Sequence, residues 1–445
     1  MRAFFGLKRT IMRSKITFKA ATTLFDSLIK PIVLYGAPLF TPTSPVVKAI
    51  VKSIKTNKPL LQNFLPKVSR SPSEKVHLSF MKWALGVHRK TSNIGTWGET
   101  GRYPLVYQAI RLTLNFYKRL QNLPNSSFAK AALKDQKLFK LPWFSYIEPL
   151  TELDEIFKLD HVSANRILNS KGRPTQLRIK PSCNKKISSL SGLREDNPLP
   201  SKKFRVEEVM KNLTQKFVQS WEDGKSSSTK LSYYNVIKQK FAREPYLDCS
   251  KGFSQRYYTT QLRISAHDLH IERGRYSNTP RDERICHWCN TSMGVAIVEC
   301  EKHLLFECDM YASLRDKLIT RLNNIPAINT DTSPHIPLIV NNDSLRQNLM
   351  HLLSPFTTKN LGNDETNQYN SHHKIPYNSP EKDQLKQRQS CIVNCVCSYI
   401  CNALKLRRKY TKSMRENRII PSVITIIMEF CDVSYIGWFH HCSGF

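Results

Sequence analysis

The strongest constraint on how this chain can fold is a set of cysteine and histidine residues near position 300. Cys286 and Cys289 stand in a C-x-x-C turn, His303 follows after thirteen residues, and Cys308 follows after four more. The short first spacing lets two thiolates of one turn reach a single ion, while the second pair approaches it from the start of a helix. The pattern predicts one structural zinc ion in a closed site, within a small zinc-knuckle-like module.

Neighbouring residues leave alternatives for this site. Cys300 or His287 could replace one of the four ligands, but two ions would need eight ligands and only six candidates are present. Trp288 lies between the first two thiolates, where it could stack on an unpaired base or, as we favour, cover the small core of the module. The alternative to a metal site is a set of unlinked reduced cysteines beside a surface histidine.

The charge of the chain indicates its partner. It contains 68 Lys and Arg residues against 35 Asp and Glu, a formal net charge of +33 at pH 7. The excess is large in residues 1–98, which hold 17 Lys and Arg but only two acids, Asp26 and Glu74. So positive a surface attracts polyanions, whereas an ordinary solvated surface mixes both signs. We therefore expect RNA or DNA as the partner, with no membrane and no small-molecule substrate, and the oligomeric state stays open.

The residues expected to contact nucleic acid lie on predicted basic helix faces, around the zinc module and in a late basic run. They are Lys82, Arg89, Lys90, Arg102, Arg111, Lys118, Arg119, Arg275, Arg281, Arg284, Trp288, Arg407, Arg408 and Lys409. The late basic run, residues 405–418, could bind phosphate or direct nuclear import.

Apolar periodicity predicts a mainly α-helical chain. The clearest helix follows Ser71, which opens an S-P-S-E capping box, and it ends at Gly86. Further helices are predicted at 104–120, from 206 to a stop at 222–224, and at 311–322, each carrying an apolar stripe. The stripes are Val76, Phe80, Trp83 and Val87; Val106, Ile110, Leu114 and Tyr117; Val206, Met210, Leu213 and Phe217; and Tyr311, Leu314, Leu318 and Leu322. Strand signals are sparse and short, as at 32–35.

Polar breakers divide the chain into regions joined by linkers. We expect a basic helical region at 1–150, a helical connector with polar linkers at 151–235 and the zinc-knuckle-like region at 236–325. Residues 326–445 would hold a low-complexity, disordered linker at about 357–390 and a C-terminal basic helix. Shorter linkers are expected at 194–203 and 223–230.

Cysteine usage and apolar runs indicate the compartment. The apolar run at 3–7 is too short for a secretory signal, so the twelve cysteines fit a reducing compartment, nuclear or cytoplasmic. A basic N-terminus without acids before Asp26 also resembles a mitochondrial transit peptide, the alternative that we do not favour. The apolar stretch at 419–439 contains Glu429 and Asp432, so no transmembrane helix is expected. Cys391, Cys395, Cys397 and Cys401 fit helix packing better than a second metal site.

The sequence argues against polymerase catalysis by this chain. Phosphoryl-transfer polymerases hold two metal ions with clustered carboxylates, and no Asp-Asp pair is present. The G-x-x-x-x-G-K, H-E-x-x-H and G-x-S-x-G motifs are also absent. Spacing alone leaves a Cys–His nucleophile open.

Three segments, in order, resemble the region downstream of the polymerase palm in the reverse transcriptase of non-LTR, LINE-type retrotransposons. Residues 25–36 resemble the thumb-entry stretch that ends in L-Y-G. Residues 80–87 and 98–105 are similar to F-x-K-x-x-L-G-V and G-E-L-G-R-x-P-L, with Thr100 in place of leucine. Residues 262–276 and the Cys286 to Cys308 pattern resemble the terminal knuckle, with Cys300 where the family pattern is usually acidic. The likeness covers most of residues 20–325.

The resemblance implies a function and leaves alternatives. The intact family protein copies RNA into DNA, and its thumb and knuckle grip template or target, whereas this chain would begin after the catalytic palm. We therefore expect a non-catalytic nucleic-acid-binding remnant. The alternatives are a truncated gene model of an active RNA-directed DNA polymerase and a zinc-stapled protein-interaction module whose charge is incidental.

Overall fold

The computed structural model describes Gly6 and residues 16–55, 65–153, 205–250, 252–325 and 380–415. Across these ranges the chain is mainly α-helical, as predicted, and extended pairing is limited to two isolated bridges, Thr100 with Arg243 and Ile285 with Val298. No helix in these ranges combines the length and apolarity needed to cross a bilayer. The linkers predicted at 194–203 and, up to residue 379, at 357–390 lie outside the described residues.

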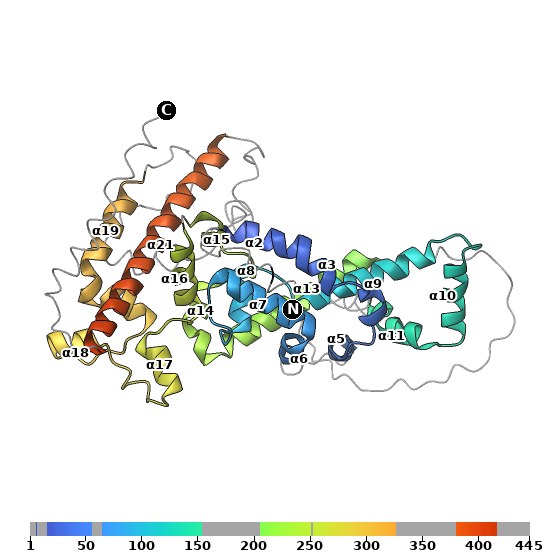
Figure 1. Ribbon diagram of the computed structural model, residues 1–445, viewed down its shortest axis with the longest axis horizontal. Coiled ribbons are helices and arrows are strands. Elements are labelled where there is room, and N and C mark those ends of the chain that lie inside the picture. Colours follow the sequence, from blue (N-terminus) through green and yellow to red (C-terminus); the bar gives the residue numbers. More distant parts are fainter. Residues whose placement is uncertain are drawn as a thin grey trace, which may run out of the picture. The chain divides into compact units, whose positions relative to one another are not determined.

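The chain divides into two compact units, each built from segments that are far apart in sequence (Figure 1). Unit 1 comprises Met1–Tyr35, Ser69–Pro104 and Trp221–Phe445, and unit 2 comprises Gly36–Val68 and Leu105–Ser220. The helices of unit 1 are α2 (Phe18–Leu24), η2 (Phe25–Ile29), α3 (Lys30–Val33), α7 (Pro72–Leu85), α8 (Asn93–Thr100), η3 (Thr229–Leu231), α14 (Ser232–Ile237), α15 (Tyr246–Cys249), α16 (Phe253–Arg263), α17 (His270–Tyr276), α18 (His287–Met293), η4 (His303–Glu307), η5 (Asp309–Tyr311), α19 (Ala312–Asn323) and α21 (Pro380–Arg415). Unit 2 contains α4 (Ala37–Phe40), α5 (Pro45–Lys55), α9 (Leu105–Gln121), α10 (Phe128–Leu138) and α11 (Pro142–Thr151). Two further helices, α6 (Leu65–Arg70) and α13 (Val206–Ser226), contribute residues to both units.

Helix α7 forms as its sequence predicts. The Ser71 side chain accepts a hydrogen bond from the Glu74 backbone N–H at the N-terminus, and Gly86 ends the helix with φ +82°. The predicted apolar stripe is buried, and Phe80 packs against Phe25 and Trp83. The Glu74 carboxylate is also buried, where it contacts the His77 ring and accepts a hydrogen bond from Trp97. Helix α7 is therefore a central packing element of unit 1.

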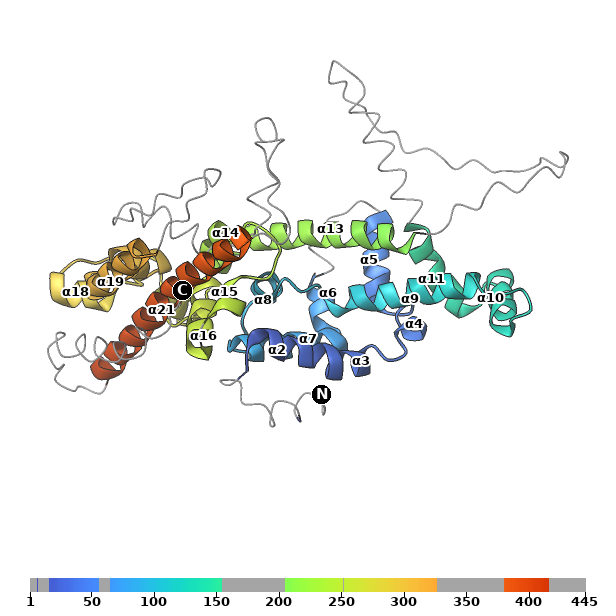
Figure 2. The same cartoon turned by 90° about the horizontal axis from the view of Figure 1, so that it is seen from above.

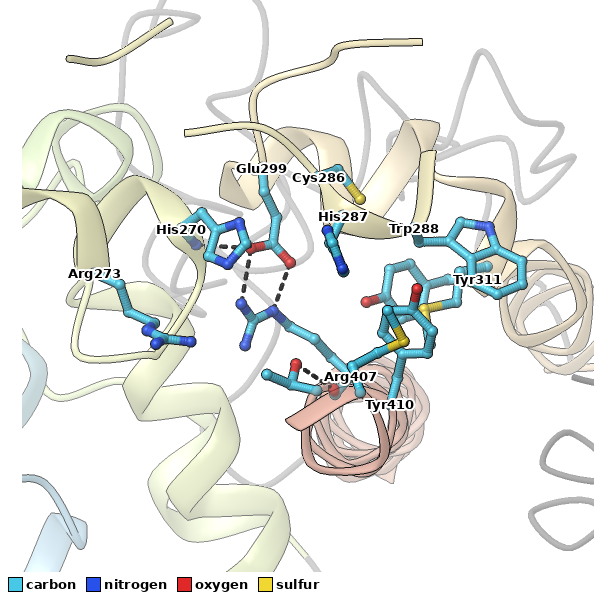
Figure 3. Close-up of a pocket in the computed structure, with 12 residues that line it drawn as sticks. His270, Arg273, Cys286, His287, Trp288, Glu299, Tyr311, Arg407 and Tyr410 are labelled. Carbon is cyan, nitrogen blue, oxygen red and sulfur yellow. Dashed lines mark hydrogen bonds and ion pairs between the residues drawn. The ribbon is translucent and has the colours of Figure 1, made fainter. Parts of the chain in front are cut away.

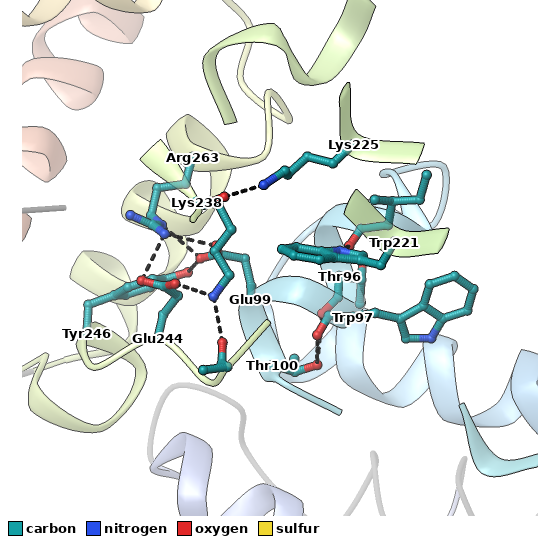
Figure 4. Close-up of polar contacts among 12 residues, drawn as sticks. Thr96, Trp97, Glu99, Thr100, Trp221, Lys225, Lys238, Glu244, Tyr246 and Arg263 are labelled. Carbon is teal, nitrogen blue, oxygen red and sulfur yellow. Dashed lines mark hydrogen bonds and ion pairs between the residues drawn. The ribbon is translucent and has the colours of Figure 1, made fainter. Parts of the chain in front are cut away.

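A buried ionic cluster joins the middle of unit 1 (Figure 4). Arg263, at the end of α16, contacts the Glu99 carboxylate of α8 at 2.9 and 3.1 Å and Glu244 at 2.8 Å. Lys238 pairs with Glu244, and the Tyr246 hydroxyl donates to Glu99. The four charged side chains are at most 1% exposed. Two carboxylates and two cations make the cluster electrically neutral, as burial demands.

Gly98, directly before Glu99 of this cluster, is needed for close packing of α8 against its neighbours. A Cβ atom at Gly98 would lie 2.4 Å from the Tyr234 hydroxyl oxygen and 2.6 Å from the Trp221 ring. Side chains cannot approach that closely, so α8 packs against these aromatics only with glycine at this position. The G-E-T-G-R segment therefore contributes one close helix contact and one buried carboxylate.

Helix α21 packs along α15, α16 and α19, with which it lies side by side in unit 1 (Figure 1). Val393, Val396, Cys397, Ile400 and Cys401 are buried, so packing of Cys397 and Cys401 is confirmed, whereas Cys391 is exposed. The helix begins at Pro380, and the predicted disordered linker is therefore wrong for residues 380–390. The apolar stripe of α21 packs against the neighbouring helices of unit 1, so this helix is part of the core of that unit.

Unit 2 has its own core around α9, which contacts α4, α5 and α10 (Figure 2). The predicted stripe of α9 is buried, and Tyr117 joins Leu120, Leu133, Phe144 and Ile147 in an apolar cluster. Trp143 donates a hydrogen bond to the Pro38 carbonyl oxygen, which ties α11 to the start of α4. The helix predicted at 104–120 is confirmed.

Two further sequence-based element assignments are wrong. The strand signal at 32–35 is not realised, because residues 32 and 33 belong to helix α3. The predicted stop at 222–224 and the linker at 223–230 are replaced by α13, which runs to Ser226, and by the short turn η3. Trp221 is fully buried and Lys225 is 3% exposed, so burial of these flanking side chains outweighs the weak helix propensity of Gly224.

The neutral cluster provides a stability test. Glu99→Gln keeps the shape of the side chain but leaves a net positive charge in a site without water access, and we expect a loss of about 3–5 kcal/mol in the free energy of unfolding. Urea unfolding monitored by circular dichroism measures this loss. Glu283→Gln removes an exposed carboxylate of the same unit and should change the free energy by less than about 1 kcal/mol. Equal stability of the two variants would contradict the argument.

Candidate functional site

The first half of the predicted site is held by a short backbone pairing. The Cys286 N–H donates to the Ile297 carbonyl oxygen at 2.6 Å, and the Glu299 N–H donates to that of Arg284 at 2.8 Å. Helix α18 starts immediately after Cys286, which places Cys289 in its first turn. Both sulfur atoms therefore face the same side of the turn.

The second half is a π-helical turn. His303 begins η4 and Cys308 follows its last residue, so the Cys308 N–H donates to the His303 carbonyl oxygen at 2.9 Å in an i to i+5 bond. The wide turn brings the His303 ring and the Cys308 thiol, with four residues between them, to one side of the backbone.

These two halves bring all four predicted ligands together. The ligand atoms of Cys286, Cys289, His303 and Cys308 all lie within 4.8 Å of one another, and the four residues are buried. The Cys289 sulfur is 3.4 Å from His303 Nε2 and 3.7 Å from the Cys308 sulfur. Cys300 and His287 are not part of this group. The cluster is a site that could hold one metal ion.

Crowding of the thiols shifts their pKa values in opposite directions. A hydrogen bond from Cys308 lowers the pKa of the Cys286 thiol to about 3. The same contact raises the pKa of Cys308, and burial raises that of Cys289 to about 11. Three thiolates this close repel one another, so a bound cation would be needed to deprotonate them all.

Surrounding groups orient the ligands. The Glu307 carboxylate lies 3.6 Å from His303 Nδ1, too far for a hydrogen bond, while Nε2 of the same ring faces the Cys289 sulfur. Arg315 donates to the Cys308 carbonyl oxygen at 2.7 Å, and the Tyr399 hydroxyl of α21 donates to that of Leu305, also at 2.7 Å. Residues beyond the ligand set commonly fix ligand orientation in this way. Glu307 was missed in the sequence, although its position four residues after His303 places it on the same side of a helical turn.

Three of the cations predicted to contact nucleic acid are used inside the fold, which corrects those predictions. Lys82 is 7% exposed and donates to the Arg89 carbonyl oxygen and the Asn93 side chain. Arg284 donates to the carbonyl oxygens of Ile271 and Thr279. Arg407 is 2% exposed and binds Glu299 with two contacts, at 2.6 and 2.8 Å. Their charges are directed inward because each side chain donates to oxygen atoms of the protein itself.

Several other predicted cations form ion pairs nearer the surface. Arg102 is held by Asp26 through two contacts, which lower the pKa of that carboxyl group despite its partial burial. Arg111 pairs with Glu207 and Arg275 with Glu272. Arg408 lies near Asp268 and over the Tyr258 ring. These four residues have less charge available for phosphate than the sequence suggested.

The remaining predicted contacts are accessible. Arg89, Lys90, Arg119, Arg281 and Lys409 are exposed, and Lys118 is half-buried. Trp288 is also half-buried, with its ring edge-on to Tyr410 at a centroid distance of 5.5 Å.

Comparisons with protein-family models, curated proteins and solved structures found no match to this chain.

The cluster predicts selective metal loss. We expect the wild-type protein and Cys300→Ser to retain one metal ion per chain after gel filtration, because Cys300 lies outside the ligand group. Cys308→Ser should retain little, since it removes one of four ligands. Mass spectrometry of metal content measures the difference. Equal metal content in both serine variants, or none in the wild-type protein, would overturn the assignment.

The burial of Lys82 predicts a pH effect. Desolvation, with a smaller contribution from Lys230, lowers the pKa of Lys82 from 10.5 to about 8. Between these values the unfolded chain retains a proton that the folded chain has lost, so the free energy of unfolding rises with pH. Relative to Lys82→Met, the wild-type protein should therefore gain stability from pH 8 to 10. Lys75→Met, an exposed position on α7, is the control, and a pH-independent difference for Lys82→Met would contradict the expectation.

Proposed function

We propose that this chain is a non-catalytic nucleic-acid-binding protein in which a single zinc ion organises one binding region. The observation that carries the proposal is the disposition of charge. Buried carboxylates such as Glu99, Glu244 and Glu299 are paired with buried cations, and each pair removes one charge of either sign. Because these buried pairs are neutral, they do not reduce the net charge of +33, and a chain this positive attracts polyanions.

Zinc is the metal that the ligand set favours. Three thiols and one imidazole are soft and intermediate ligands, and tetrahedral zinc with Zn–S bonds of about 2.3 Å places two sulfur atoms about 3.8 Å apart. The Cys289 and Cys308 sulfur atoms lie 3.7 Å apart. Four protein ligands leave no open coordination position, so we assign the ion a structural role. Reduced thiols also agree with a nuclear or cytoplasmic location.

Two segments that resemble the region downstream of the palm in LINE-type reverse transcriptases contact each other in the fold. Glu99 belongs to the segment that resembles G-E-L-G-R-x-P-L, and Arg263 belongs to the segment that precedes the knuckle-like pattern. The two side chains form a buried ion pair. Two of the motifs on which the resemblance is based are thus parts of one packed structure, and we propose that the chain derives from such an element.

A second candidate, a protein-interaction module, has one observation in its favour. Phe128, Leu138 and Phe139, in and after α10, are 94%, 75% and 67% exposed. Exposed apolar side chains can mark a contact with another protein. Lysines at 130, 134, 137 and 140 belong to the same segment of the sequence, so a polyanion would also be attracted to it.

Salt dependence with matched lysine variants tests the proposal. Binding of duplex DNA should weaken linearly with salt on logarithmic axes, and loss of one phosphate contact should reduce the slope by about 0.9. We expect this reduction in Lys90→Met, which removes an exposed charge. Lys82→Met removes the same charge from a buried site and should leave the slope unchanged. Fluorescence anisotropy measures both, and salt-insensitive binding, or no binding, would refute the proposal.

A further inference from the structure

Beside the metal cluster lies a pocket with a volume of about 330 Å³ (Figure 3). It opens among α17, the turn that begins α18, and the C-terminal part of α21. Its lining combines aromatic, basic and sulfur-containing side chains. They are His270, Arg273, Cys286, His287, Trp288, Glu299, Met310, Tyr311, Arg407, Tyr410, Thr411 and Met414.

The aromatic and basic residues occupy different parts of the pocket. Figure 3 shows Trp288, Tyr311 and Tyr410 grouped at one end and Arg273 and His270 at the other. Tyr311 and Tyr410 are buried, whereas Trp288 is half-buried and packs edge-on against Tyr410, so that part of its surface stays accessible. An aromatic ring at that end would find a stacking partner.

The charge of the pocket is positive. Its lining contains one carboxylate, Glu299, which is already bound by Arg407 through two contacts and by the His270 N–H at 2.7 Å. Arg273 and His287 are exposed, and their side chains form no hydrogen bond or ion pair with any residue in the described ranges. Arg273 is therefore available to an anion, and no uncompensated acid opposes it.

The position of Arg273 is fixed by the packing of its helix. A Cβ atom at Gly274 would lie 2.5 Å from Arg284 Nε, so glycine lets α17 approach this side chain closely. Arg284 in turn donates to the Ile271 carbonyl oxygen of α17 at 2.8 Å. The internal role of Arg284 is thus to hold α17 against the metal module, which pre-organises the basic end of the pocket.

We propose that this pocket binds one unstacked nucleotide of a single-stranded RNA or DNA, with the base against Trp288 and a phosphate at Arg273. An aromatic surface and a guanidinium at opposite ends match the two chemical parts of a nucleotide. A purely apolar ligand would leave Arg273 unused, and a simple anion would leave Trp288 unused. The proposal rests on the nucleic-acid-binding function and specifies where a base is bound.

Binding to short oligonucleotides tests the pocket directly. The probes are a single-stranded oligothymidylate, an oligouridylate and an abasic strand with the same number of phosphates. Trp288→Ala should weaken binding of the two base-containing strands about 5- to 150-fold, since one stacked base contributes that much, and should leave binding of the abasic strand unchanged. Trp288→Phe should retain most of the affinity, because it keeps an aromatic face.

Two controls separate the pocket from its surroundings. Tyr276→Ala removes an aromatic residue of the same unit that is 75% exposed and lies outside the pocket, and it should not change binding. Metal content of Trp288→Ala should equal that of the wild-type protein, which verifies that the module is intact. Arg273→Gln should weaken binding of thymidine monophosphate but not of thymidine, which distinguishes phosphate contact from base contact.

The outcomes distinguish failure of the pocket from failure of the function. If no strand binds in a salt-dependent manner, the nucleic-acid-binding function itself is wrong. If all three strands bind equally and Trp288→Ala binds them like the wild-type protein, the function stands and the pocket proposal is refuted. If only free thymidine monophosphate binds there, the pocket takes a mononucleotide instead of a strand, which also refutes the proposal.

Discussion

Unit 1 depends on the pairing of buried charges. Arg263 with Glu99 and Arg407 with Glu299 each connect segments that are distant in sequence. A buried guanidinium without its carboxylate would be strongly destabilising, so each pair requires both segments to be in place. These pairs are neutral, so they leave the large positive excess of the chain unchanged.

The metal cluster is part of this framework. Tyr399 and Arg407 of α21 contact Leu305 and Glu299, which lie on either side of His303 in the sequence, and Arg315 contacts the backbone of Cys308. A metal ion at the cluster would hold α18 and η4 together, while α21 holds the pair against the unit. The pocket lies where these parts meet, so its aromatic and basic ends are positioned by the metal cluster and by α21.

Sequence reasoning succeeded where the signal was local. The Ser71 cap, the stop at Gly86 and the apolar stripes of α7 and α9 depend on neighbouring residues, and so does the spacing of the four ligands. It failed where the deciding partner is distant. Arg407 appeared as one cation of an exposed basic run, and its partner Glu299 is 108 residues away. Lys82 lies off the apolar stripe of α7, yet Arg89 in the following loop and Asn93 at the start of α8 supply the oxygen atoms that bind its ammonium group. Charge alone does not reveal which cations face inward.

The central claim is that a metal-braced, cationic surface binds a nucleic-acid strand at defined positions. Photo-crosslinking of the full-length protein to a single-stranded oligonucleotide, with mass spectrometry that locates each adduct to a residue, tests this most directly. The account predicts adducts at Trp288 and in the exposed segment at Arg89 and Lys90, reduced by excess salt and, at Trp288, by removal of the metal. Adducts spread evenly over the accessible surface, or an adduct pattern at Trp288 unchanged by metal removal, would contradict it.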